Sequence, residues 1–92
     1  MVEDAILISD RDNVATALRD LPAGSVILLS LSGGEIQVKL VQDIPFGHKF
    51  ALKRIARGEV VVKYGEAIGI AVEDIEAGEH VHIHNVRSNR GK

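Results

Sequence analysis

The chain has 92 residues, a formal net charge of −2 and no cysteine. This length allows one domain and not two. The mixed charges offer no basic patch for nucleic acid, and the absence of cysteine excludes disulfides, thiolate metal sites and cysteine nucleophiles. The N-terminus shows no signal peptide, and no apolar run approaches the roughly 20 residues that span a bilayer. We therefore expect a cytoplasmic domain with neither nucleic acid nor a membrane as its partner.

The composition favours strands. Apolar residues make up 46% of the chain, which supports a core, whereas aromatic residues make up only 3%. Val, Ile, Leu and Ala dominate, and β-branched residues pack well between strands. A domain of this size buries only about 60–65% of its unfolded surface, so its stability is marginal unless a partner covers more. We predict a mostly β fold with one short helix.

In chain order, the first predicted elements are a strand over residues 5–8 and a helix over residues 14–20. Asp12 and Asn13 precede the helical segment and serve as its N-cap candidates. Two strands follow, over residues 25–31 and 35–41, joined through Ser32-Gly33-Gly34 as a hairpin. In the second of these strands apolar and polar residues alternate, which predicts one buried face and one wet face.

Further strands are predicted over residues 50–55, 60–63, 67–72 and 80–85. The residues from Asn85 onward lack apolar periodicity, and we expect them to fray. We place a single domain at residues 1–88 and a disordered tail at residues 89–92.

One short pattern, which we call a corner, occurs four times: an apolar residue, two variable residues, and a glycine that leads into a strand. An aspartate precedes three of the corners. The pattern predicts a turn with glycine at positive φ above a buried apolar anchor. Irregular spacing excludes a solenoid. The corners are Leu21-Pro22-Ala23-Gly24, Ile44-Pro45-Phe46-Gly47, Ile55-Ala56-Arg57-Gly58 and Ile75-Glu76-Ala77-Gly78.

Three of the four histidines alternate in His80-Val81-His82-Ile83-His84. On a strand they share one face, about 6.5–7 Å apart, while Val81 and Ile83 turn to the core. Neighbouring imidazoles on one face can converge on a metal or a substrate. A further ligand would come from His48, a carboxylate or a second chain. The alternative interpretation is a polar strand face with three solvated histidines.

Two other segments carry titratable side chains. Gly47-His48-Lys49 follows a corner and has the charges to hold a carboxylate, although an ordinary surface turn is the alternative. Lys63-Tyr64-Gly65 contains the only tyrosine of the chain, and the pair suits acid–base or oxyanion roles. Its alternative is a lysine that extends to solvent beside a tyrosine at the edge of the core.

Four segments, in this order, resemble the N-terminal domain of the altronate/galactarate dehydratases: DNVATAL (12–18), IPFGHK (44–49), KYGEAIG (63–69) and HIHN (82–85). The resemblance spans roughly residues 5–88 and implies an SAF-type domain with a β-clip fold. Two positions depart from the family pattern. Ser9 stands where many relatives carry a histidine, and Glu66-Ala67 replaces a small residue followed by proline.

The resemblance implies dehydration of an aldonic or aldaric sugar acid to a 2-keto-3-deoxy acid. It also implies a divalent metal, Fe²⁺ or Mn²⁺, shared with a partner. Family members carry this domain fused to a large C-terminal domain or as a separate small subunit. We predict the separate form, a carbon–oxygen lyase subunit that is inactive without its large dehydratase partner; a homo-oligomer is also compatible with this interpretation.

Site residues follow from the resemblance together with the patterns above. The prediction assigns metal binding to His82 and His84, catalysis to His48, Lys49, Lys63 and Tyr64, and substrate binding to Asn13 and Asn85. Three other interpretations stay open: the small subunit of a sulfolactate sulfo-lyase, a non-catalytic module that binds a sugar acid or docks a partner, and an autonomous metal binder.

Overall fold

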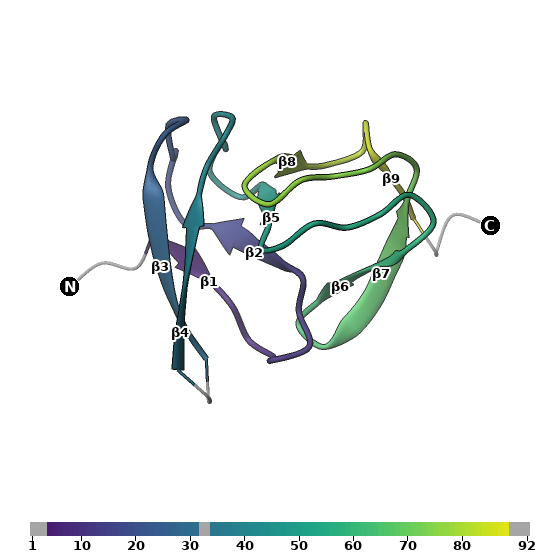
Figure 1. Cartoon of the computed structure of the whole chain (residues 1–92), viewed down its shortest axis with the longest axis horizontal. Helices are drawn as coiled ribbons and strands as arrows, with labels where there is room; N and C mark the ends of the chain where they lie inside the picture. Colours follow the sequence, from purple (N-terminus) through teal and green to yellow (C-terminus); the bar gives the residue numbers. More distant parts are fainter. Residues whose placement is uncertain (1–3, 32–33, 89–92) are drawn as a thin grey trace.

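The computed structural model describes residues 4–31 and 34–88, and this part of the chain contains strands and no helix. The strands form three sheets, with orders β1-β2-β5-β8, β3-β4 and β6-β7-β9 (Figure 1). All pairings between neighbouring strands are antiparallel. The strands are β1 (Ala5–Ile6), β2 (Val14–Ala17), β3 (Val26–Leu31), β4 (Gly34–Lys39), β5 (Lys49–Ala51), β6 (Val60–Lys63), β7 (Glu66–Ala71), β8 (His80–Val81) and β9 (Val86–Ser88).

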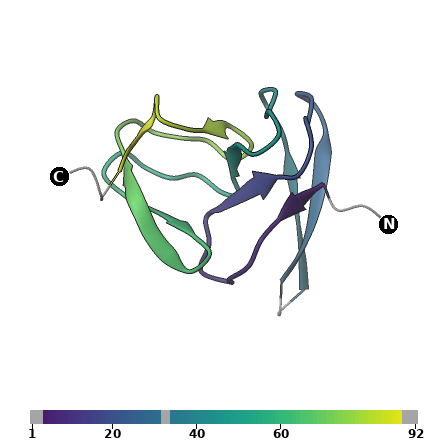
Figure 2. The same ribbon diagram turned by 180° about the vertical axis from the view of Figure 1, so that it is seen from behind.

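The β1-β2-β5-β8 sheet lies in the middle, with the β3-β4 ribbon over one face and the β6-β7-β9 sheet over the other (Figures 1 and 2). Because side chains alternate across a strand, the middle sheet contributes side chains to two cores, one on each face. In β5, Phe50 is buried in the core under β3-β4, whereas its neighbour Ala51 is buried in the core under β6-β7. In β2, Ala15 and Val14 divide in the same way.

The predicted helix over residues 14–20 is wrong. Residues Val14–Ala17 form strand β2, which pairs with β1 and with β5. The physical reason is burial on both sides, because an extended segment places Val14 in one core and Ala17 in the other. Val14 and Thr16 are β-branched and suit this conformation. The predicted helix caps, Asp12 and Asn13, bind other parts of the backbone, as described below.

The four corners are confirmed. Each apolar anchor is at most 1% exposed, and the four glycines have φ between 84° and 91°. The corners also pair, which the sequence pattern did not predict: Leu21 bridges Ile44, and Ile55 bridges Ile75. In both pairs the two backbones exchange N–H···O hydrogen bonds of 2.8 Å. The pairs therefore tie distant parts of the chain together under the glycine turns.

In the first pair of corners, the aspartate that precedes each corner accepts a hydrogen bond from the backbone of the other corner. Asp20 accepts a hydrogen bond from the Phe46 N–H, and Asp43 accepts one from the Ala23 N–H, each at 2.8 Å. In the second pair, Asp74 accepts the Arg57 N–H at 2.9 Å. Arg54 occupies the position of the missing aspartate and forms ion pairs with Asp74 at 3.1 Å and with Glu76 at 3.2 Å.

The hairpin prediction is confirmed, since β3 and β4 pair from Val26↔Lys39 to Leu31↔Gly34. The connecting residues Ser32 and Gly33 lie outside the described residues. The C-terminal prediction needs correction, because Asn85 is 4% exposed and the residues after it form β9 against β7. The fold therefore extends through residue 88, and the predicted tail over residues 89–92 lies outside the described residues.

Candidate functional site

The histidines gather in one cluster. Ring centroids of His48 and His82 are 4.0 Å apart, those of His48 and His80 are 5.0 Å apart, and those of His80 and His84 are 5.2 Å apart. His48 Nδ1 lies 2.8 Å from His80 Nε2, a hydrogen-bonding distance. The rings of His48, His80 and His82 are stacked, with interplanar angles of 12–18°, and His84 lies tilted against His80.

Strand pairing explains why these segments meet. β5 and β8 are antiparallel neighbours with Phe50 opposite His80 and Lys49 opposite Val81. One residue further in the same register, His48 faces His82, which accounts for the short distance between their rings. Each of these two strands begins just after a corner, β5 after Gly47 and β8 after Gly78.

The predicted strand over residues 80–85 is wrong beyond Val81. The chain bends at His82 and turns through Asn85, so the predicted burial of Ile83 is also wrong: Ile83 is 85% exposed. The Asn85 amide causes the turn. Its Oδ1 accepts the His82 N–H at 2.9 Å, and its Nδ2 donates to the His80 carbonyl at 2.8 Å. One buried side chain therefore fixes the backbone of two clustered histidines.

Three histidines have the geometry of a metal-binding set. The ligand atoms of His48, His80 and His82 all lie within 4.8 Å of one another, and the three side chains are partly buried. Three imidazoles suit first-row divalent metals, and the further coordination positions stay open to other ligands. The donor set therefore fits the divalent metal implied by the family resemblance.

This trio differs in part from the predicted ligand pair. His82 belongs to it, but the trio does not contain His84, an exposed residue whose ring is tilted against that of His80. The trio also contains His80, which the sequence prediction did not assign to the site, and His48, which it assigned to catalysis. The corner pattern carried a signal for this cluster, since two strands that leave equivalent glycine turns can pair. In the observed register Phe50 lies opposite His80, which brings His48 opposite His82. Metal binding by His82 and His84 stays a prediction.

Electrostatics favour the metal-binding form of the imidazoles. Burial, and then the neighbouring His48, lowers the pKa of His80 and of His82. A lowered pKa keeps an imidazole neutral to a lower pH than usual, and the neutral ring is the one that binds a metal. Lys49 adds to the effect on both rings because its positive charge opposes their protonation.

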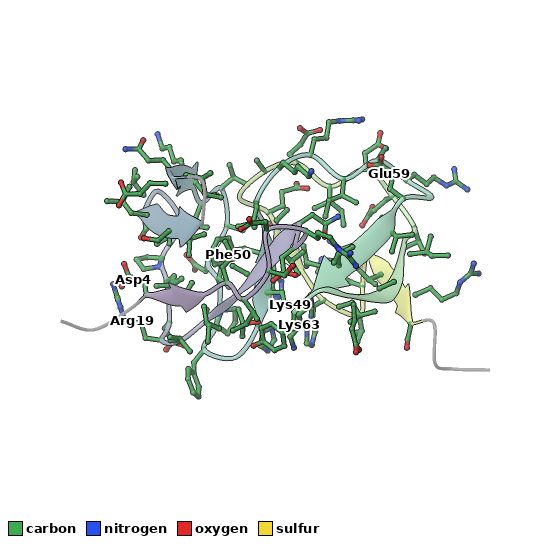
Figure 3. The ribbon with its side chains drawn as sticks, turned by 90° about the horizontal axis from the view of Figure 1, so that it is seen from below. Asp4, Arg19, Lys49, Phe50, Glu59 and Lys63 are labelled. Carbon is green, nitrogen blue, oxygen red and sulfur yellow. The ribbon has the colours of Figure 1, made fainter. Side chains whose placement is uncertain are left out.

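Lys49 occupies a groove beside the histidines. The groove has a volume of about 170 Å³ and is lined by Lys49, Ile68, His82, Ile83, Val86 and Ser88. Burial lowers the pKa of Lys49, and the nearby charge of Lys63 lowers it further. Figure 3 shows the two lysines next to each other. A pair of ammonium groups at an apolar groove attracts an anion, and a carboxylate relieves their mutual repulsion.

Thr16 adds a polar atom on the face of the middle sheet that carries Lys49. It lies opposite Lys49 in the pairing of β2 with β5, so both side chains share a face. Its Oγ1 is buried and finds no hydrogen-bond partner among the described residues. Buried hydroxyl groups normally have a hydrogen-bond partner, so the Thr16 hydroxyl is an exception on the face that carries Lys49.

Tyr64 lies at the tip of the β6-β7 hairpin in a strained conformation. Its φ is 55°, and the following Gly65 has a φ of 79°. A bulky residue in this region costs roughly 1–2 kcal/mol, and such strain is typical of functional sites. Lys63 Nζ lies 4.9 Å from the centroid of the Tyr64 ring, a cation–π contact. Tyr64 is 44% exposed, which leaves it accessible to a ligand.

Asp12 holds this hairpin in place. Its buried carboxylate accepts the Gly65 N–H at 2.7 Å through Oδ1 and the N–H groups of Ile8 and Ser9 at 3.3 and 3.2 Å through Oδ2. The predicted helix cap is in fact a clamp between the loop before β2 and the Tyr64 turn. Its effect is to fix the position of the tyrosine.

Asn13 serves the backbone of β6. Its Oδ1 accepts the Val62 N–H at 2.7 Å, and its Nδ2 donates to the Val60 carbonyl at 2.9 Å. Asn13 and Asn85 thus bind the backbone in the same manner, one on each side of the β5 segment. Their predicted contact with a substrate stays a prediction.

A larger groove lies elsewhere. It has a volume of about 360 Å³ and is formed at the corners of Leu21 and Ile44. Its carboxylates, Asp20 and Asp43, already accept backbone amides, and no histidine or lysine lines it. The titratable groups that can bind and move protons are instead those around Lys49. We therefore assign the candidate site to the smaller groove and the histidine cluster.

Comparison with known proteins defines the class to which the fold and this site belong. Residues 3–89 match the altronate/galactarate dehydratase SAF domain, so the chain belongs to that family and its fold is the all-β SAF domain. No helix of the described residues is long and apolar enough to cross a membrane.

Individual relatives are enzymes of the same group. The chain is 51% identical to altronate dehydratase of Escherichia coli over 84 residues, which are 91% of this chain and 16% of that enzyme. It is 46% identical over 84 residues to altronate dehydratase of Bacillus subtilis. It is 54% identical over 48 residues to (2R)-sulfolactate sulfo-lyase subunit alpha of Paracoccus pantotrophus, covering 52% of this chain and 72% of that subunit. The chain thus spans about a sixth of the length of the two dehydratases.

Proposed function

We propose that this chain forms one side of a hydroxy-acid lyase site, in which His48, His80 and His82 hold a divalent metal, Fe²⁺ or Mn²⁺. The observation that supports this most strongly is the trio of imidazoles, with ligand atoms within 4.8 Å of one another beside the Lys49 groove. The substrate is a sugar acid of the altronate or galactarate type. A large partner closes the site and supplies the remaining groups.

The chemistry requires three functions. Elimination of water β to a carboxylate needs a base for the α-proton, a cation beside the enediolate, and an acid for the departing hydroxide. A divalent metal, when bound, supplies the positive charge that stabilises the enediolate oxygens. Lys49 binds the substrate carboxylate in its groove, where partial burial strengthens the attraction between charges. Tyr64 lies beside Lys63 and donates a proton to the leaving group. The base for the α-proton comes from the partner.

A second function has its own support. Sulfolactate sulfo-lyase subunit alpha is a short chain, since 48 aligned residues are 72% of its length. A substrate with a sulfonate in place of the leaving hydroxyl would meet the same pair of lysines, Lys49 and Lys63, whose charges suit a sulfonate as well as a carboxylate. We keep this alternative behind the dehydratase because identity to altronate dehydratase covers 91% of the chain.

A chimaeric enzyme tests the proposal. In it, this chain replaces the aligned 84-residue region of Escherichia coli altronate dehydratase. We expect turnover of altronate, measured as 2-keto-3-deoxy acid, and loss of turnover after treatment with a chelator. Galactarate and sulfolactate are assayed in parallel to identify the better substrate. A chimaera that folds but eliminates from none of the three acids would contradict the proposed function.

The metal site itself can be tested in the isolated chain through Asn85→Ala. Loss of the amide leaves the His82 N–H and the His80 carbonyl without partners, at a cost of about 1–3 kcal/mol in unfolding free energy. We expect the Kd for Mn²⁺, measured by calorimetry, to rise about 10–100-fold, as when a residue that orients metal ligands is removed.

Asn13→Ala is the matched control for this variant. It removes an equivalent pair of side-chain hydrogen bonds, in this case to the backbone of β6, which lies outside the trio. We expect it to destabilise the chain and leave the Kd for Mn²⁺ unchanged. Equal changes of the Kd in both variants would show that Asn85 acts through general stability.

A further inference from the structure

Two large, exposed apolar side chains belong to the two segments that carry the histidine cluster. Ile83 is 85% exposed and Phe46 is 65% exposed, the highest values among the exposed large hydrophobic residues of the described chain. Ile83 lies between His82 and His84, and Phe46 lies two residues before His48. Since the rings of His48 and His82 are 4.0 Å apart, both apolar side chains belong to segments that meet at the same cluster.

The backbone holds both segments firmly. The Phe46 N–H donates to Asp20 at 2.8 Å within its corner. The turn that carries Ile83 is closed by Asn85, whose side chain binds His82 and whose N–H donates to the His82 carbonyl at 3.2 Å. Apolar side chains on a fixed backbone lose little conformational freedom on binding, which is the property of an interface anchor.

The groove beside the histidine cluster is open to solvent at Ile83. Ile83 also lines the groove of about 170 Å³ that contains Lys49 and His82, so this wall of the groove is an exposed turn. Closing an active site expels water and strengthens the electrostatic interactions within it. Contact with a second polypeptide at Ile83 would close that wall and bury the apolar surface in one step.

We propose that Ile83 and Phe46 anchor this domain to the catalytic remainder of a dehydratase, so that the histidine cluster and the Lys49 groove are closed across that interface. The inference rests on the proposed function and specifies where the partner binds. The partner is the part of the enzyme outside the aligned region, since the 84 aligned residues are only 16% of altronate dehydratase. Its docking surface presents an apolar recess to each anchor.

Thiol labelling tests this contact without relying on activity. The chain has no cysteine, so single Ile83→Cys and Phe46→Cys variants each carry one thiol. The control is Leu28→Cys, because Leu28 is 56% exposed on the outer face of β3, whose inner face packs against the core. Labelling rates with a maleimide are measured by mass spectrometry of the cysteine peptide, in the isolated chain and in the chimaeric enzyme.

We expect the thiols at positions 83 and 46 to react at least about 10-fold more slowly in the chimaera than in the isolated chain, because a thiol reacts according to its exposure. The thiol at position 28 should react at the same rate in both. Equal rates at positions 83 and 46 in the two proteins, or protection confined to position 28, would overturn the proposed docking.

The outcome separates docking from function. A chimaera that protects positions 83 and 46 and eliminates from no hydroxy acid keeps the docking proposal and contradicts the function. A chimaera that turns over altronate while both thiols stay fully reactive keeps the function and refutes the docking.

Discussion

Gly78→Ala is expected to destabilise the chain by more than about 4 kcal/mol, enough to unfold a domain of this size at ambient temperature. Two effects combine. Gly78 has a φ of 87°, which an alanine adopts only with strain. In addition, a Cβ at this position would overlap the carbonyl oxygen of Lys39 and lie 3.2 Å from the Cα of Leu40. The backbone cannot move away, because Gly78 bonds Ala51 through its N–H and Val41 through its carbonyl.

Gly58→Ala is the matched control. Gly58 has a φ of 90° in an equivalent corner, but its Cβ would meet nothing within 4 Å. We expect a loss of roughly 1–2 kcal/mol from backbone strain alone. Urea unfolding followed by far-UV circular dichroism measures both variants. Equal midpoints for the two would show that the close approach to Lys39 is unimportant.

His82→Ala is expected to lower the turnover of altronate by the chimaeric enzyme about 100-fold or more, whereas the KM changes much less. His82 belongs to the trio that we propose to bind the metal, and it also lines the Lys49 groove, so its loss affects both parts of the proposed site. The Kd for Mn²⁺ of the isolated variant should rise in parallel.

The control is His84→Ala. The His84 ring is tilted against that of His80, with ring centroids 5.2 Å apart, but His84 lies outside the trio. We expect turnover within about 3-fold of the parent chimaera, in the range of an exposed side chain near a site. Wild-type turnover in His82→Ala would remove His82 from the site, and equal losses in both variants would disprove the assignment of the trio.

The elements that the sequence predicted correctly are those with local causes. The corners were predictable because a glycine at positive φ and a buried anchor are encoded within four residues, and the β3-β4 hairpin follows from alternation around a turn. The family resemblance was also readable from short segments, and the match over residues 3–89 confirms it.

The errors concern segments whose conformation depends on distant partners. Residues Val14–Ala17 are short enough to suit either a helix or a strand, and pairing with β1 and β5 decides for the strand. The alternating histidines predicted a strand, but the Asn85 amide turns the chain after Val81. The contact between His80 and His48 was not predicted, because the two residues lie 32 positions apart in the sequence. Strand register cannot be read from one segment alone.

The order of strands in the middle sheet has a consequence for biosynthesis. β8 pairs with β5 and is the last strand to join that sheet. A nascent chain that has not yet emerged from the ribosome through residue 82 therefore lacks two of the three imidazoles of the trio. Any ion that the trio captures then cross-links two segments 32 residues apart, and closure of such a loop restrains the unfolded chain more than the folded one. Metal binding by the trio, as proposed above, would therefore follow synthesis of β8 and stabilise the folded domain against the unfolded chain.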